Sequence, residues 1–147
     1  MIEVYTDGSC LGNPGTGGWA FQVFNEGTTI NHFGYQLDTT NNQMELTAAI
    51  KALEFLQKES EIILFTDSTY VRNGITSWIV NWKKNNWKNS QRKDVKNKIL
   101  WEKLDVLNSR KNITWKWVKA HDINEHNNKV DLLAREAAEN LIKSSFD

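Results

Sequence analysis

The chain has 147 residues, of which 39% are hydrophobic and seven are tryptophan, enough apolar side chain for one sizeable core. We therefore expect residues 1–147 to form a single domain. The single cysteine, Cys10, excludes an internal disulfide and a zinc site built from cysteines. Eighteen basic and eighteen acidic residues balance, which argues against attraction of nucleic acid by the overall charge. With neither a signal-peptide pattern nor a segment of membrane-spanning length, we expect a cytoplasmic protein.

The segment Thr6–Ser9 places a carboxylate where a strand meets a glycine-rich turn. Alternating apolar side chains predict a strand over Ile2–Thr6, closed by Asp7. The residues that follow, up to Trp19, contain five glycines and the only proline, which favours a turn and close approach of the backbone. Most Asp-Gly pairs simply form turns, so a functional role of Asp7 depends on the rest of the chain.

A meander and a helix come next. Residues 18–37 predict two strands joined by a turn at Asn25–Gly27, and with the first strand these make an antiparallel meander. Thr39–Asn42 favours the start of a helix, and Gln43–Lys58 is rich in helix-forming residues. Glu45 lies in the first turn on the apolar stripe and so faces inward. The alternative is that Glu45 only compensates the helix dipole.

The middle of the chain repeats the strand-to-carboxylate pattern. Residues Glu61–Thr66 predict a short apolar strand, buried on both faces, and Asp67 follows it as Asp7 follows Thr6. A helix is predicted from Tyr70 to Trp82. Its apolar stripe consists of Val71, Ile75, Trp78 and Trp82.

The last third predicts a helix from about Val95 to Leu107, a strand over Ile113–Val118 and a final helix that begins near Asn127 or Asn128. Asp131 lies in the first turn of that final helix. The order of elements is three strands, a helix, a strand, helices, a strand and a helix. This order predicts an α/β domain with a mixed sheet covered by helices.

Four carboxylates occupy comparable places in this scheme: Asp7 and Asp67 close two strands, while Glu45 and Asp131 open two helices. If the two strands are parallel neighbours, all four side chains converge at one end of the sheet. Four negative charges at such short distances repel one another, and a divalent cation bound between them offsets the repulsion. Oxygen-only ligands select magnesium (Mg2+) or manganese (Mn2+), and Mg2+ commonly bridges carboxylates and a substrate phosphate. The cluster therefore points to phosphodiester chemistry.

The segment Lys83–Lys103 is strongly basic, with eight basic residues against only Asp94 and Glu102, a local net charge of +6. Trp82 and Trp87 lie among its lysines, as aromatic side chains do in grooves that bind nucleic acid. The alternative is a solvated helix face.

Five sequence motifs, together with their order and separations along the chain, mark a resemblance to a known family that covers nearly the whole chain. These are TDGSCLGNPGTGGW, TTNNQMELTAAI, FTDSTYVRNGI, WIVNWKKNNWK and WVKAH, with an aspartate ten residues after His121, the last residue of WVKAH. With these motifs the sequence resembles the bacterial type 1 ribonucleases H, which cut the RNA strand of RNA/DNA hybrids.

The resemblance implies a ribonuclease H-like fold: a mixed five-stranded sheet, three antiparallel strands followed by parallel strands, with helices on both faces. It implies a monomer that uses two Mg2+ ions, with Mn2+ as a possible substitute, and leaves 5′-phosphate and 3′-hydroxyl ends. The metal-binding catalytic carboxylates would be Asp7, Glu45, Asp67 and Asp131. His121 would assist as a proton-transfer or product-release helper.

The resemblance also implies two substrate-binding surfaces. One would follow the minor groove and read the 2′-hydroxyl of the RNA with Cys10, Asn13, Asn41 and Asn42. Cys10 is then a neutral contact and not a nucleophile, because no oriented histidine pair activates it. The other surface would hold the DNA strand with Trp78, Lys83, Lys84, Trp87 and Lys88.

Two alternatives remain open at this point. One is another magnesium nuclease of the same fold, such as a transposase or junction-resolvase domain, although 147 residues leave little room for the extra segments these need. The other is a catalytically silent module that binds hybrids. Four clustered carboxylates argue against it, because a binder gains nothing from negative charge beside phosphates.

Overall fold

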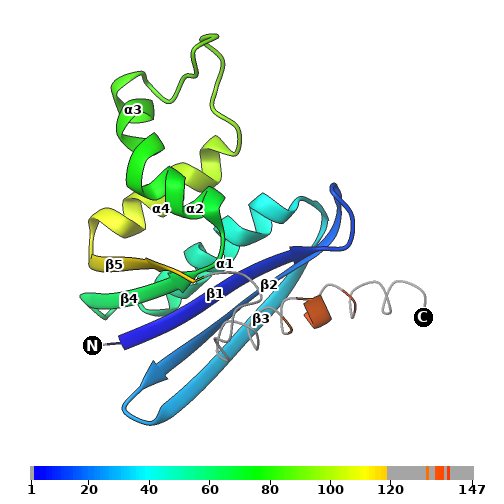
Figure 1. Ribbon diagram of the computed structural model, residues 1–147, viewed down its shortest axis with the longest axis vertical. Helices are drawn as coiled ribbons and strands as arrows, with labels where there is room; N and C mark the ends of the chain where they lie inside the picture. Colours follow the sequence, from blue (N-terminus) through cyan, green and yellow to red (C-terminus); the bar gives the residue numbers. More distant parts are fainter. Residues whose placement is uncertain (1, 119–131, 133–134, 138, 140–147) are drawn as a thin grey trace.

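The computed structural model describes residues 2–118, 132, 135–137 and 139. Its five strands form one sheet in the order β3-β2-β1-β4-β5 (Figure 1). Neighbours β1, β2 and β3 pair antiparallel, whereas β4 is parallel to both β1 and β5. The predicted mixed sheet is therefore confirmed. The strands are β1 (Ile2–Cys10), β2 (Gly15–Asn25), β3 (Thr28–Thr39), β4 (Glu61–Thr66) and β5 (Asn112–Trp117).

The helices of the described chain follow the predicted order. They are α1 (Asn41–Phe55), α2 (Thr69–Asn73), the π-helix η1 (Gly74–Trp78), α3 (Ile79–Lys84) and α4 (Lys98–Ser109). Residues 132, 135–137 and 139 are helical and belong to the predicted final helix, whose start lies outside the described residues. No helix in the described part of the chain is long and apolar enough to cross a membrane.

The strand β1 is longer than predicted. It continues to Cys10 because its second half pairs with β2, where Asp7 lies opposite Ala20. Asp7 is therefore inside a strand and not at its end, as the sequence had suggested. The parallel pairing with β4, however, stops at Thr6 and Thr66. Asp7 and Asp67 thus both come one residue after the last parallel pair, side by side at the same level of the sheet.

The turn between β2 and β3 confirms the predicted hairpin. Glu26 and Gly27 connect the two strands with positive φ angles of 48° and 81°. Positive φ at both central residues is the geometry of the two-residue turns that suit the twist of antiparallel strands.

The main core combines residues of the sheet with residues of α1 and α4, and α1 contributes more of them than any other element. Leu46 and Leu53 of α1, Leu64 of β4 and Leu104 of α4 are fully buried there. On the other face of β1, Tyr5 stacks on Phe65 with a centroid distance of 4.3 Å. The two faces of β1 alternate as predicted.

The helical segment after β4 differs from the continuous helix that the sequence predicts. The π-helical turn η1 shifts the buried stripe, so that Gly74 and Ile79 are buried, while Trp78 is exposed. A Cβ atom on Gly74 would overlap the ring of Trp101, which is fully buried against it. The wider π turn places Gly74 against the ring of Trp101 in α4, so two segments that are distant in the sequence are in contact.

Two helix boundaries also differ from the prediction. The first helix ends at Phe55 and not at Lys58, and the ammonium group of Lys111 donates hydrogen bonds of 2.7–2.9 Å to three carbonyls that follow this end. The helix α4 begins at Lys98 and not near Val95, because Asn97 has a left-handed backbone with φ of 60°.

Candidate active site

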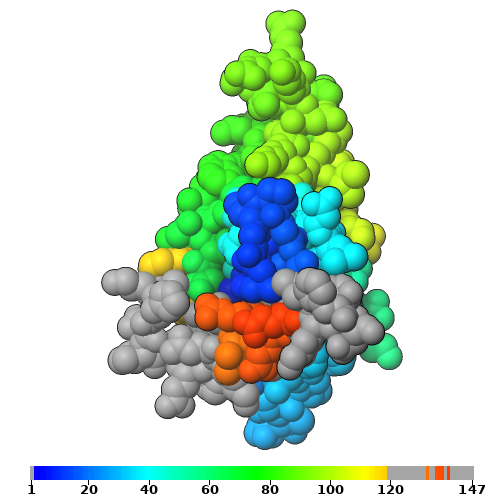
Figure 2. Space-filling view, turned by 90° about the vertical axis from the view of Figure 1, so that its right-hand side faces the viewer, coloured from blue at the N-terminus to red at the C-terminus, as the bar shows by residue number. Residues whose placement is uncertain are grey.

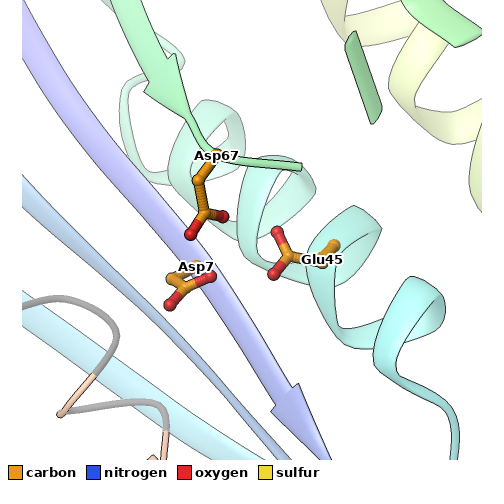
Figure 3. A group of neighbouring side chains, drawn as sticks. All are labelled: Asp7, Glu45 and Asp67. Carbon is orange, nitrogen blue, oxygen red and sulfur yellow. The ribbon is translucent and has the colours of Figure 1, made fainter. Parts of the chain in front are cut away.

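Three of the four predicted carboxylates meet at one place. Asp7 from β1, Glu45 from α1 and Asp67 after β4 point toward one another (Figure 3). One carboxylate oxygen from each lies within 4.8 Å of the others. Asp7 and Glu45 are buried, with 1% and 5% of their surface exposed. The predicted convergence is confirmed for these three residues.

Gly8 explains how Glu45 reaches the strand that carries Asp7. A Cβ atom on Gly8 would overlap the backbone of Met44 and Glu45, so α1 can lie this close to β1 only at a glycine. The amide of Gly8 donates a hydrogen bond of 3.1 Å to Oε1 of Glu45. The predicted close backbone approach in the glycine-rich run is thus part of the carboxylate site.

The first turn of α1 joins the glycine-rich turn after β1. The hydroxyl of Thr40 caps the helix by accepting from the amide of Gln43 at 3.2 Å. The side-chain oxygen of Asn13 accepts from the amide of Asn41 at 3.2 Å, and the thiol of Cys10 donates to the carbonyl of Thr39 at 3.4 Å. Figure 2 shows the turn (blue) between α1 (cyan) and the helices after β4 (green).

Three of the predicted minor-groove residues, Cys10, Asn13 and Asn41, therefore lie around one helix start. Asn42 follows in the same turn, and Asn41 and Asn42 line the same cavity as the carboxylates. The substrate-binding role of these four residues stays a prediction. Asn13 has a structural contact in addition, because its oxygen satisfies an amide at the start of α1.

Asp67 lies between the end of β4 and the start of α2. The hydroxyl of Ser68 caps α2 by accepting from the amide of Val71 at 3.1 Å. The indole of Trp117 donates to the carbonyl oxygen of Asp67 at 3.2 Å, from the neighbouring strand β5. Both contacts fix the backbone on the C-terminal side of Asp67.

The carboxylates open into a cavity of about 380 Å³ whose lining also includes Tyr70 and Arg135. Arg135 was not predicted as a site residue. A signal was available, because Arg135 follows Asp131 by four residues on the predicted final helix, and residues at that spacing share a helix face. Asp131 and His121 themselves lie outside the described residues, so their roles stay predictions.

The chemistry of the cluster fits a hard divalent cation. All donors are carboxylate oxygens, one oxygen of each residue lies within 4.8 Å of the others, and the cavity leaves room for water and a phosphate group. Asp7, Glu45 and Asp67 are thus the described residues that can hold Mg2+ or Mn2+. Thiolate and imidazole ligands, which suit zinc, are absent from this group of three.

The end of α3 and the loop that leads to α4 project from the body of the molecule (Figure 1). Residues 83–97, which carry most of the basic segment, are called the projecting segment. At its base, Trp82 contacts the rings of Trp78, Trp87 and Trp101 at centroid distances of 5.9, 6.1 and 5.4 Å. Trp87 is partly buried against the core, whereas Trp78 is 37% exposed. Of the two tryptophans predicted to bind substrate, Trp78 presents the larger surface.

Hydrogen bonds connect this base to α1. The hydroxyl of Tyr70 accepts from the indole of Trp101 at 2.9 Å and from the side chain of Asn97 at 3.0 Å. The oxygen of Asn97 in turn accepts from Gln43 at 3.1 Å. Gln43 precedes Glu45 by two residues, so the network ties the projecting segment to the helix that carries a site carboxylate.

The predicted DNA-strand lysines differ in their surroundings. Lys83 forms an ion pair of 3.0 Å with Asp105 of α4, and Lys88 pairs with Asp94 within the projecting segment. The hydrogen bond and positive charge of Lys88, with a further contribution from Lys98, hold the pKa of Asp94 below its ordinary value of 3.8. Lys84 is exposed and has no ion-pair partner within residues 2–118.

Together, the sheet order, the helices and the carboxylates between two parallel strands and a helix define a ribonuclease H-like fold. The structure of LC9-RNase H1, described as a type 1 RNase H with the type 2 active-site motif, matches with a TM-score of 0.83 and 27% identity over 95% of this chain and 72% of that one. The RNase H family model matches residues 1–139. The chain belongs to the RNase H family.

Individual relatives are similar over nearly their whole length. The Ribonuclease H of Francisella tularensis subsp. novicida (strain U112) is 50% identical over 141 residues, which are 96% of this chain and 93% of that protein. The structure of LC11-RNase H1 in complex with an RNA/DNA hybrid has a TM-score of 0.70 and 27% identity, covering 97% of this chain and 99% of that one.

Proposed function

We propose that this protein is an endonuclease that hydrolyses the RNA strand of RNA/DNA hybrids with two divalent metal ions, leaving 5′-phosphate and 3′-hydroxyl ends. The observation that carries the proposal is the convergence of Asp7, Glu45 and Asp67 at one cavity. The similarity to LC11-RNase H1, which was solved with an RNA/DNA hybrid, supports the choice of substrate. Residues 1–147 act as one domain and as a cytoplasmic monomer in this proposal.

Each carboxylate has a distinct position in the proposed metal site. Asp7 and Glu45 provide buried oxygens, and Asp67, at the end of β4, is less buried. Asp131 is the fourth proposed ligand. Two ions held by these residues would supply positive charge that activates water and stabilises the leaving 3′ oxygen. His121 is proposed as the proton-transfer helper.

The proposed substrate contacts form two groups. In the first group, Asn41 and Asn42 line the carboxylate cavity, and Cys10 and Asn13 are hydrogen-bonded at the start of the same helix. Side-chain amides there suit recognition of the RNA 2′-hydroxyl. In the second group, the DNA strand is proposed to contact Trp78, Lys83, Lys84, Trp87 and Lys88. The positive charge of this projecting segment explains how a chain without net charge binds a polyanion.

The experiment is cleavage of a labelled RNA/DNA hybrid in the presence of Mg2+, beside matched single strands, duplex RNA and duplex DNA. The expected result is cleavage confined to the RNA strand of the hybrid, abolished by a chelator. Cleavage of duplex DNA would instead support another magnesium nuclease of this fold. Hybrid binding without cleavage, in both Mg2+ and Mn2+, would support a catalytically silent module.

A further inference from the structure

We propose that Trp117 is a positioning residue for the metal-binding carboxylate of Asp67. Its indole N–H donates a hydrogen bond of 3.2 Å to the carbonyl oxygen of Asp67, a residue 50 positions earlier in the chain. Trp117 is the last residue of β5, and β5 pairs in parallel with β4, which ends at Thr66. This role rests on the proposed metal-dependent function, because it concerns the placement of one proposed ligand.

The end of the sheet explains why Asp67 needs such a contact. Within residues 2–118, the last backbone bond between the two strands runs from the amide of Val118 to the carbonyl of Thr66 at 2.9 Å. Asp67 follows this bond and so lies beyond the strand ladder that fixes its predecessors. At this point the indole of Trp117, and not the strand pairing, fixes the peptide group on the C-terminal side of Asp67. This contact also fixes the direction of the Asp67 side chain.

Packing of the ring alone does not account for Trp117. The residue is 42% exposed, in contrast to Trp101, which is fully buried in the core. The guanidinium group of Arg72 in α2 lies 5.7 Å from the centroid of the Trp117 ring. A cation at this distance from an indole is attracted to the ring and holds it from the α2 side. Trp117 therefore contacts both elements that flank Asp67, the strand β4 and the helix α2.

The proposed metal makes the position of Asp67 critical. Mg2+ requires near-ideal octahedral geometry, and a ligand held about 0.5 Å from its best position binds it poorly. Contacts that orient a ligand typically change metal affinity or activity by about 10–100-fold when removed. Because Trp117 holds the backbone of Asp67 and does not touch the carboxylate, we expect an effect near the lower end, about tenfold.

The variant Trp117→Phe removes the N–H group and keeps an aromatic ring. Trp115→Phe is the matched control: Trp115 lies on the same strand, and its indole donates at 2.9 Å to the side chain of Asn108, in α4 and away from the carboxylates. Two quantities are measured for both variants, namely the Mg2+ concentration that gives half-maximal cleavage of a hybrid and the affinity for Mg2+ without substrate by calorimetry. The kcat and KM values at saturating Mg2+ are compared as well.

We expect Trp117→Phe to raise two Mg2+ midpoints by about tenfold: the concentration for half-maximal cleavage and the dissociation constant measured by calorimetry. The KM for the hybrid should change little. Trp115→Phe should leave the Mg2+ midpoints at the value of the unchanged protein, even where it lowers the melting temperature. Equal midpoints in Trp117→Phe and the unchanged protein would overturn the proposal, as would an equal rise in both variants. Binding measured without substrate remains informative if the protein cleaves no hybrid, which separates this inference from the proposed function.

A measurement on the unchanged protein covers the case in which Trp117→Phe does not fold. In two-dimensional 1H–15N NMR spectra, addition of Mg2+ should shift the indole N–H signal of Trp117, which is hydrogen-bonded to Asp67, more than that of Trp115. Equal or absent shifts of the two indole signals would contradict a coupling between Trp117 and the metal site.

Discussion

Gly8→Ala tests whether close contact between α1 and β1 forms the carboxylate site. The added methyl group would overlap the backbone of Met44 and Glu45, and neither can rotate away as a flexible side chain can. The helix has to move, and overpacking of this kind costs about 1–3 kcal/mol. For a chain of this length we expect the melting temperature to fall by roughly 3–10 °C.

The effect on activity should be larger than the effect on stability. Movement of α1 breaks the bond of 3.1 Å between the amide of Gly8 and Oε1 of Glu45 and takes Glu45 away from Asp7. Displacement of a site residue by about 1 Å can lower the rate about 100-fold. We therefore expect turnover of an RNA/DNA hybrid to fall by about that factor, measured at saturating Mg2+ and well below the melting temperature.

Gly27→Asn is the matched control for Gly8→Ala. Gly27 lies in the turn between β2 and β3 with nothing near its missing side chain, and asparagine tolerates its positive φ of 81°. Both turnover and melting temperature should change little. If Gly8→Ala retained turnover within about threefold of the unchanged protein, the close contact would not control the site, and the expected 100-fold loss would be refuted.

Further predictions concern the carboxylates, the projecting segment and the histidine. Asp67→Asn should remove nearly all cleavage while the protein still folds and binds hybrid, as measured by a cleavage assay beside a binding assay. Lys84→Ala should lower the slope of log affinity against log salt by about 0.9, and Lys83→Ala by less, because Asp105 already neutralises Lys83. An NMR titration of Asp94 should give a midpoint below 3.8; since the folded pKa is lowered, the stability from this group is present above the unfolded pKa and is lost as pH falls through the folded pKa. His121→Ala should lower kcat by about tenfold to a few hundredfold with little change in hybrid affinity, which steady-state kinetics will check.

Local patterns predicted the elements that carry the carboxylates, because each pattern depends on neighbouring residues. Alternation located β1, a short apolar run located β4, and capping residues located the start of α1 within two residues. Convergence required one further assumption, that β1 and β4 are parallel neighbours, and the structure confirms it. With this pairing, carboxylates that follow Thr6 and Thr66 must lie side by side.

Features that depend on distant segments could not be predicted in the same way. The length of β1 is set by its partner β2, and the π-helical turn at Gly74 accompanies the packing of Trp101 from α4. The end of α1 depends on Lys111, which reaches back from the turn before β5. No periodic pattern within one element encodes contacts of this kind, although Gly74 itself was a visible departure from a good helix sequence.

The helix α1 connects the two parts of the proposed function. At Glu45 it supplies a carboxylate, and at Gln43 it bonds to Asn97, which holds Tyr70 at the base of the projecting segment. Side-chain hydrogen bonds therefore link the helix that carries Glu45 to the base of that segment. Since a cut at a defined phosphate requires a fixed distance between the bound DNA strand and the metal site, this connection matches the task of α1 in the proposed reaction.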